Sequence, residues 1–207
     1  MQTKLLIFDQ DGTLYSRNSN LMKYTRLKTK KWIAKELNIS DEEVEKIYAE
    51  LPIKYPNPYL GFMSLGCEVS DYMSQVFDKI EPQDFLEFNK ELYMFFKNNN
   101  IRKSLVTMSS KTYTKKLQSC LKLYDFYESI LYVNEFKTYN KKEGYKMLAK
   151  KLNVSYPEIC VIGDSIENDL KPAKDIGCKT VLISEHVNNE YRTVKNIEEF
   201  IRKRAYE

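Results

Sequence analysis

The residues best suited to chemistry form a short acidic cluster near the N-terminus of this 207-residue chain. Asp9 and Asp11 follow an apolar run that predicts a buried strand over residues 3–9, and Gly12 predicts the turn that ends it. Because side chains alternate along a strand, both carboxylates are expected on one face at its carboxyl end. Two such charges repel unless a cation lies between them, and Mg²⁺ is a hard cation that prefers oxygen ligands. The simpler alternative is two polar residues that only cap a strand.

Further polar residues stand where two other apolar runs end. The second run leads into Asp164 and Asp169, and the third ends in Thr107. Lys141 begins a helical pattern shortly before the second acidic pair. Ligands of open α/β sheets bind at the carboxyl ends of the strands. The common position of these acids, the hydroxyl and the lysine therefore predicts a single site.

The elements that must position these residues alternate along the chain. Strands are predicted at 3–9, 103–107, 129–133, 158–163 and 179–183, with helices at 111–122, 141–152, 167–176 and 196–204. This alternation predicts an α/β fold with a Rossmann-like, doubly wound, mostly parallel sheet that carries helices on both faces. The sheet is interrupted after its first strand by a long helical stretch.

That stretch predicts a small all-helical cap over residues 16–80, inserted into a core formed by 1–15 and 81–207. Helices are expected at 21–37, at 41–51 after a capping box, and at 69–80, and prolines 52, 56 and 58 are expected to break the chain between them. After the cap, another helix is expected to start at Pro82, with an apolar stripe formed by Phe85, Phe88, Leu92 and Phe96. Tyr55, Tyr59 and Phe62 lie in the broken part, where one of them could face a base or sugar of a substrate.

These motifs resemble the haloacid dehalogenase-like (HAD) superfamily of phosphohydrolases. Residues 9–13 are similar to its first motif, Thr107 to its second, Lys141 to its third, and residues 163–169 to its fourth. The predicted cap resembles that of the subgroup containing pyrimidine 5'-nucleotidases and phosphoglycolate phosphatases. The resemblance implies a Mg²⁺-dependent phosphatase for a small phosphomonoester, such as a nucleoside monophosphate or a sugar or organic-acid phosphate. The reaction would pass through an aspartyl-phosphate.

The resemblance also implies a role for each acidic residue. Asp9 would be the nucleophile, and Asp11 would act first as general acid and then as general base. The side chains of Asp9 and Asp164 and the backbone carbonyl of Asp11 would hold Mg²⁺. Asp169 would lie behind them and orient waters or the lysine.

The phosphate group would be held by residues of three motifs. Gly12 would let the backbone turn tightly beside the nucleophile. Thr107 and the backbone N–H of Met108 would donate hydrogen bonds to phosphoryl oxygens, although close nucleotidase relatives usually have Asn in place of Met108. Lys141 would neutralise the charge on the transferring group.

The choice of lysine has alternatives, because Lys142 directly follows Lys141 and Lys137 lies nearby. In some members of the superfamily this lysine starts a helix whose apolar positions fall four and seven residues later. From Lys141 these positions are Tyr145 and Leu148, which favours Lys141. A lysine at a helix start can also be a plain surface residue.

Composition bounds the partners and the compartment. The net charge of +4 is too small to predict nucleic-acid binding, and the sequence has no apolar run long enough to cross a membrane. No signal peptide is expected, because the first residues lead directly into a strand. The cysteines are scattered and predict reduced thiols, which favours a cytoplasmic protein; they are Cys67, Cys120, Cys160 and Cys178. We expect a monomer or dimer whose partner is a small phosphorylated metabolite.

Two other functions fit the same fold. One is a sugar-phosphate mutase, which retains the phosphoryl group, and the other is a non-catalytic interaction protein. The intact set of Asp9, Asp11, Thr107 and Asp164 argues against the non-catalytic protein. A dehalogenase is disfavoured because Asp11 supplies the acid and base that phosphoryl transfer needs.

Overall fold

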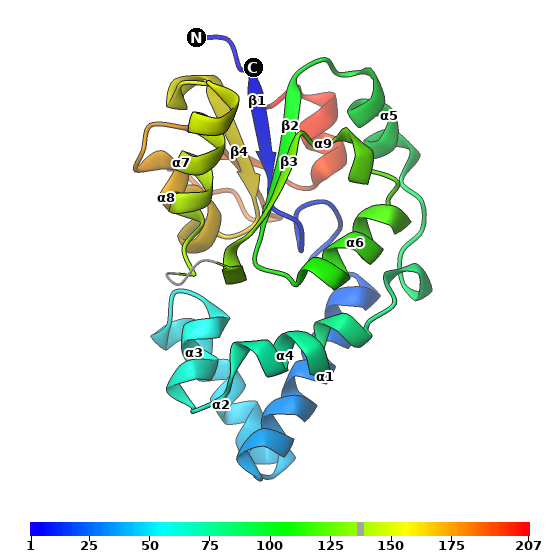
Figure 1. The fold of residues 1–207 in the computed structure, drawn as a ribbon, viewed down its shortest axis with the longest axis vertical. Coiled ribbons are helices and arrows are strands. Elements are labelled where there is room, and N and C mark those ends of the chain that lie inside the picture. Colours follow the sequence, from blue (N-terminus) through cyan, green and yellow to red (C-terminus); the bar gives the residue numbers. More distant parts are fainter. Residues whose placement is uncertain (136–138) are drawn as a thin grey trace.

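The computed structural model describes residues 1–135 and 139–207, and their strands form one parallel sheet (Figure 1). Within these residues the strand order is β3-β2-β1-β4-β5-β6. The strands are β1 (Leu5–Phe8), β2 (Arg102–Thr107), β3 (Ser129–Tyr132), β4 (Ile159–Gly163), β5 (Lys179–Ile183) and β6 (Arg192–Val194). The parallel α/β sheet confirms the predicted fold class, and its last strand, β6, is an addition to the predicted strands.

Helices cover both faces of this sheet, which makes it doubly wound (Figure 1). The core helices are α5 (Lys90–Asn98), α6 (Lys111–Cys120), α7 (Lys141–Leu152), α8 (Lys171–Lys174) and α9 (Ile197–Arg202). Leu5 and Ile7 pack with Tyr145 of α7, whereas Phe8 packs on the other face at 5.1 Å from the ring of Phe96 and 6.1 Å from that of Phe200. Burial on both faces explains why β1 is continuously apolar rather than alternating.

The segment between β1 and α5 forms a helical layer beyond the carboxyl ends of the strands (Figure 1). Its helices are α1 (Asn20–Leu37), α2 (Asp41–Lys54), α3 (Pro58–Ser64) and α4 (Val69–Gln75). Its own core is aromatic: the Phe62 ring lies 5.3 Å from that of Trp32 and 4.7 Å from that of Tyr72. Phe62 is therefore a packing residue of this layer.

Three predicted boundaries in and after this layer are wrong. Pro52 does not break the chain: α2 continues to Lys54, because Pro52 lies in its last turn, where one lost backbone hydrogen bond is tolerated. The predicted helix from Pro82 forms only a 3-10 turn over Pro82–Asp84, and α5 begins at Lys90. The Asn89 side chain caps α5 by accepting a 3.0 Å hydrogen bond from Leu92 N, which fixes the later start.

The aromatic residues assigned to the start of that helix consequently lie outside it. Phe85 stacks on Tyr24 of α1 with ring centroids 4.8 Å apart, and Phe88 is exposed. The helix predicted over 69–80 also ends early, because α4 stops at Gln75 and Phe77–Lys79 forms a 3-10 turn.

Among the described residues, no helix is long and apolar enough to span a bilayer. The cysteines in the part of the chain described are all free thiols.

Candidate active site

Asp9 directly follows β1, at the carboxyl edge of the sheet. Its backbone N–H donates a 2.8 Å hydrogen bond to the carbonyl of Ile162 in β4, which continues the strand pairing by one residue. One carboxylate oxygen accepts from Thr13 Oγ1 at 3.1 Å, and the other lies 2.5 Å from Lys141 Nζ. The Asp9 side chain is 11% exposed, so a small part of this paired side chain can be reached from outside.

Lys141 is the first residue of α7, and its ammonium group lies between two carboxylates. Besides Asp9, Nζ contacts Asp169 Oδ1 at 2.6 Å, and the side chain is only 3% exposed. Burial alone lowers the pKa of Lys141, but the adjacent charges of Asp169 and Asp9 outweigh it and raise the pKa well above its usual value. A permanently charged ammonium group is therefore held beside Asp9.

The neighbouring lysine occupies a different environment. Lys142 Nζ lies 3.3 Å from Asp175 Oδ2 at the surface, where both side chains are partly exposed. The structure therefore brings Lys141, rather than Lys142, to the acidic cluster. Lys137 lies outside the described residues.

Asp164 and Asp169 follow β4 and complete an acidic cluster with Asp9. One carboxylate oxygen from each of these residues lies within 4.8 Å of the others. Burial raises the pKa of Asp164 to about 8, and the charges of Asp9 and Asp169 contribute, while Arg17 acts in the opposite direction. Burial likewise raises the pKa of Asp169, although Lys141 offsets part of this effect. Only one cation, Lys141, contacts the buried pair Asp9 and Asp169 among the described residues, so the cluster fits an added divalent cation with oxygen ligands.

Gly12 makes room for Asp164. Its backbone has φ +90°, and a Cβ placed there would lie 2.3 Å from Asp164 Oδ2. Both the left-handed backbone and the close approach exclude a side chain at this position. The glycine predicted as a turn residue therefore also shapes the acidic cluster.

The Asp11 carboxylate is buried among hydrogen-bond donors. Tyr15 OH donates to Oδ1, Ser109 Oγ donates to Oδ2 at 2.5 Å, and Tyr113 OH lies 3.4 Å from Oδ1. Burial raises the pKa of Asp11, the charge of Asp9 raises it further, and the Ser109 and Tyr15 donors act in the opposite direction. Asp11 is thus a carboxyl group that holds its proton more strongly than an exposed aspartate.

Gln10 also contacts Asp11, a role that its position between the two acids did not indicate. Its side chain is fully buried beneath the site, where Nε2 donates to Asp11 Oδ2 at 3.1 Å. Gln118 of α6 donates to Gln10 Oε1 at 3.1 Å. The sequence offers one signal for this arrangement: a polar residue at the end of an otherwise apolar strand requires a buried partner.

Thr107 is the last residue of β2, beside β1, and Met108 follows it. Thr107 is buried, and its Oγ1 accepts a 3.0 Å hydrogen bond from Ser109 N. The backbone carbonyl of Met108 accepts a hydrogen bond from Tyr59 OH, which comes from α3 of the helical layer. Tyr59, one of the three aromatic residues considered for substrate contact, therefore contacts the loop at the end of β2 directly.

A cavity of about 670 Å³ opens beside Asp164. Its walls come from the segment that leads into α1 and from the loops after β5 and β6; they include Tyr15, Arg17, Asp164, Ser184, His186 and Lys195. Arg17 Nε lies 3.2 Å from Asp164 Oδ2. Sequence reasoning missed Arg17, because nothing in its local sequence separates it from the other basic residues of this region.

Solved structures of similar fold cover nearly the whole chain. A HAD phosphatase from Thermococcus onnurineus is 18% identical, with a TM-score of 0.63 over 99% of this chain and 98% of that one. The Bacillus subtilis protein YfnB, solved with magnesium bound, is 15% identical, with a TM-score of 0.63 over 98% and 99% of the chains. A Thermotoga maritima protein provisionally named as a β-phosphoglucomutase is 17% identical, with a TM-score of 0.63 over 99% and 98%.

A search of curated proteins found no match to the sequence. The family model of the haloacid dehalogenase-like hydrolases matches residues 3–177, which include every acidic residue of the cluster described above. The chain therefore belongs to the haloacid dehalogenase-like hydrolases.

Proposed function

We propose that this hydrolase is a Mg²⁺-dependent phosphatase that cleaves a small phosphomonoester through an aspartyl-phosphate on Asp9. The observation that supports this most strongly is the placement of Lys141 Nζ, 2.5 Å from Asp9 and 2.6 Å from Asp169. Such a buried ammonium group fixes the Asp9 carboxylate in place and offers positive charge where a phosphoryl group would arrive.

The two acids after β1 have separate environments and therefore suit separate roles. Asp9 lies beside Lys141, whereas Asp11 is surrounded by hydroxyl donors and has a raised pKa. In the first step Asp9 attacks phosphorus, and Asp11 gives its proton to the leaving oxygen. In the second step Asp11 takes a proton from the water that attacks the phosphorylated Asp9. Proton transfer of this kind typically contributes about 10²–10⁴-fold to the rate.

The backbone and hydroxyl donors at the strand ends would bind the phosphoryl oxygens. Thr107 and the N–H of Met108 lie at the end of β2, and Gly12 lies in the turn after Asp11. Mg²⁺ would be held by the Asp9 and Asp164 carboxylates and the Asp11 carbonyl, and it would neutralise charge on the phosphoryl group. Asp169, fixed by Lys141 and by a 3.0 Å hydrogen bond from Ser165 N, orients the lysine.

The helical layer is well placed to act as a cap. We assign residues 16–80 to it and residues 1–15 and 81–207 to the catalytic core, because α1–α4 lie beyond the strand ends that carry the acids (Figure 1). Such a lid excludes water and contacts the leaving group. The substrate class that we propose is a nucleoside monophosphate or a sugar or organic-acid phosphate.

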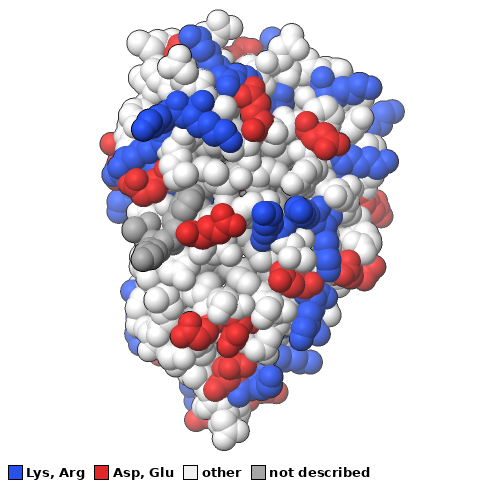
Figure 2. Space-filling model, viewed as in Figure 1, with Lys and Arg blue, Asp and Glu red and all other residues white. Residues whose placement is uncertain are grey.

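The remaining partners follow from charge and chemistry. Basic and acidic side chains are interspersed on the face drawn in Figure 2, which supports a metabolite partner rather than a nucleic acid. The free thiols support a cytoplasmic location. We propose a monomer or dimer.

A phosphatase assay tests this function. Purified protein should release phosphate steadily from para-nitrophenyl phosphate and from a panel of phosphorylated metabolites with Mg²⁺, and EDTA should abolish the release. A sugar-phosphate mutase, the name carried by one neighbour of similar fold, would instead require a phosphorylated-sugar cofactor and convert one sugar phosphate into another. Folded protein without turnover of any ester would indicate a non-catalytic member of the family.

A further inference from the structure

We propose that Tyr15 and Ser109 are positioning residues that hold the Asp11 carboxyl group for proton transfer to the leaving oxygen. The inference rests on the proposed phosphatase function and adds residues that lie outside the family motifs. Tyr15 comes from the segment that leads into α1, and Ser109 comes from the loop after β2. The Asp11 carboxyl group is therefore contacted by two segments that are distant from each other in sequence.

The two hydroxyl groups bind opposite oxygens of the same carboxyl group. Tyr15 OH contacts Oδ1, and Ser109 Oγ contacts Oδ2 at 2.5 Å. Two contacts on opposite oxygens fix the plane of the carboxyl group as well as its position. Without these two hydroxyls the carboxyl group would keep only the longer contacts of Gln10 at 3.1 Å and Tyr113 at 3.4 Å, and the last torsion of aspartate is broad.

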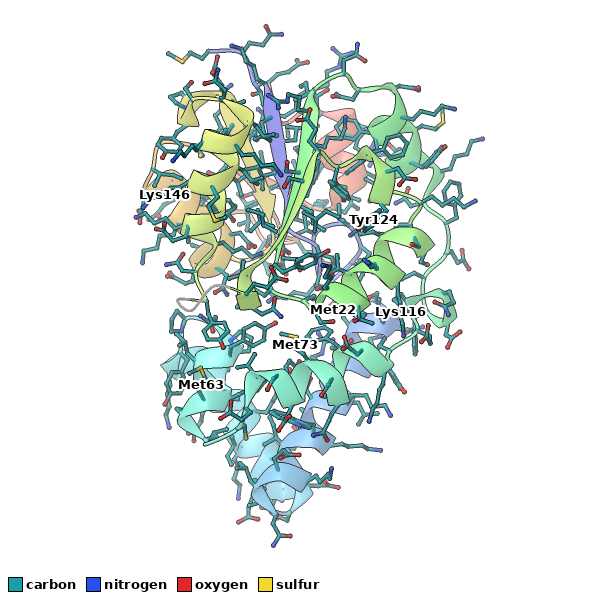
Figure 3. The ribbon with its side chains drawn as sticks, in the orientation of Figure 1. Met22, Met63, Met73, Lys116, Tyr124 and Lys146 are labelled. Atoms are coloured by element: carbon teal, nitrogen blue, oxygen red, sulfur yellow. The ribbon has the colours of Figure 1, made fainter. Side chains whose placement is uncertain are left out.

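Tyr15 and Ser109 are themselves fixed by neighbouring residues. Ser109 N donates a 3.0 Å hydrogen bond to Thr107 Oγ1, which ties its loop to the end of β2. Tyr15 OH lies 3.3 Å from Tyr113 OH and 3.7 Å from Met22 Sδ, and Tyr113 is fully buried in the first turn of α6. Met22 lies at the end of α1 nearest the core, close to α6 in the view of Figure 3.

Hydroxyl groups suit a residue that must change its protonation state. A hydroxyl can donate to the Asp11 carboxylate and can rotate to accept from the protonated acid, whereas an ammonium or guanidinium group can only donate. Tyr15 and Ser109 can therefore support both forms. When the P–O bond breaks, the Asp11 proton goes to the leaving oxygen, the phosphoryl group goes to Asp9, and Asp11 remains as a carboxylate that accepts from both hydroxyls.

Position matters because a general acid works only within hydrogen-bond reach of the oxygen that it protonates. A displacement of about 1 Å can cost about 100-fold in rate. Loss of the Tyr15 or Ser109 hydroxyl should therefore weaken protonation of the leaving group, while Asp9 and Lys141 keep their own contacts. The deficit should depend on how much the leaving group needs a proton.

A leaving-group series gives the decisive measurement. In Tyr15→Phe and in Ser109→Ala, kcat/KM for alkyl phosphates should fall about 10–100-fold, because an alkoxide leaves poorly without a proton. For para-nitrophenyl phosphate, whose phenolate leaves without help, the fall should stay below about 3-fold. The plot of log kcat/KM against leaving-group pKa should become steeper. Tyr206→Phe, which removes a buried hydroxyl bonded to Asn99 at 3.1 Å far from the site, should leave the slope unchanged.

The same changes in an Asp11→Asn background show whether Tyr15 and Ser109 act through Asp11. There, Tyr15→Phe should cause no further fall with para-nitrophenyl phosphate. An equal fall for all esters, or a further fall in the Asp11→Asn background, would overturn the inference. If Tyr15→Phe does not fold, as judged by its thermal melt, Ser109→Ala decides the question alone. An inactive wild-type protein would instead refute the phosphatase function itself.

Discussion

Lys141 Nζ lies 2.5 Å from Asp9 Oδ1, and both side chains are almost completely buried. Removal of the lysine leaves Asp9 and Asp169 without their shared cation. We predict that Lys141→Met lowers the free energy of unfolding by about 3–5 kcal/mol, the cost of breaking a buried ion pair from one side, and abolishes turnover. Urea titration and a phosphatase assay measure the two effects.

Lys142→Met is the matched control, because Lys142 is the next residue and its ammonium group, within residues 1–135 and 139–207, pairs only with the exposed Asp175. Its stability should change by less than about 0.5 kcal/mol, and its turnover should stay near that of the wild type. If Lys142→Met were the inactive variant and Lys141→Met the active one, the assignment of the phosphate lysine would be wrong.

Gly12→Ala should remove both stability and metal binding. A Cβ on Gly12 would lie 2.3 Å from Asp164 Oδ2, in addition to the strain of a left-handed backbone. Gly66 has φ +77°, but a Cβ at this position would have nothing within 4 Å, so Gly66→Ala reports the strain alone. We predict a cost of about 1–2 kcal/mol for Gly66→Ala with full activity, and a larger cost with loss of activity for Gly12→Ala. Equal activity of the two variants would contradict the role given to the Gly12–Asp164 contact.

Stabilisation by Mg²⁺ should increase with pH. The folded chain keeps the Asp164 proton up to a pKa of about 8, whereas an unfolded aspartate loses it near pH 4. The metal-free fold therefore binds more protons than the unfolded chain between these values, and its stability falls as the pH rises. Metal binding needs the ionised carboxylate, so the difference in Tm with and without MgCl₂ should widen from about pH 6 to about pH 9.

The variant Asp164→Asn serves as the control for this pH dependence. It cannot ionise at this position, so its Tm should respond little to MgCl₂ at any of these pH values. A Tm difference in the wild type that does not vary with pH would show that Asp164 does not control metal binding.

Tyr59 should influence the choice of substrate more than Phe62 does. The Tyr59 hydroxyl reaches the Met108 carbonyl across the boundary between α3 and the core, whereas Phe62 packs against Trp32 and Tyr72. We expect Tyr59→Phe to change the ranking of substrates by KM at a stability cost of about 1 kcal/mol. Phe62→Leu should lower Tm and affect all substrates alike. The opposite pattern would place the substrate against the inner side of the helical layer.

The sequence predicts most of the sheet because its strands are buried on both faces and appear as apolar runs. It predicts β5 at residues 179–183 and α7 at 141–152, both with the observed bounds. It misses β6, whose three residues are too short for a recognisable period. It also misplaces α5, because the phenylalanines before Asn89 match a helical stripe although the Asn89 side chain starts the helix later.

The candidate site likewise contains residues that the sequence could place and contacts that it could not. Asp9, Asp164 and Lys141 could be placed together from the sequence because strand ends and a helix start converge at one edge of a parallel sheet. The contacts of Tyr15, Ser109 and Tyr113 with Asp11 could not, since they depend on how the segment leading into α1 packs against α6. The contacts of Ser109 and Tyr113 join residues 98 and 102 positions from Asp11, and the Tyr15 contact, four positions away, lies in a turn without a recognisable motif.

The most direct measurement of the central claim is the mass of the Asp9 peptide after turnover is stopped by acid. The account predicts that the wild-type peptide carries one additional phosphoryl group during turnover of para-nitrophenyl phosphate with Mg²⁺. Asp9→Asn should fold with a similar thermal melt, carry no phosphoryl group and show no turnover. Rapid turnover by folded Asp9→Asn, or a phosphoryl group found on another residue of the active wild type, would contradict the account.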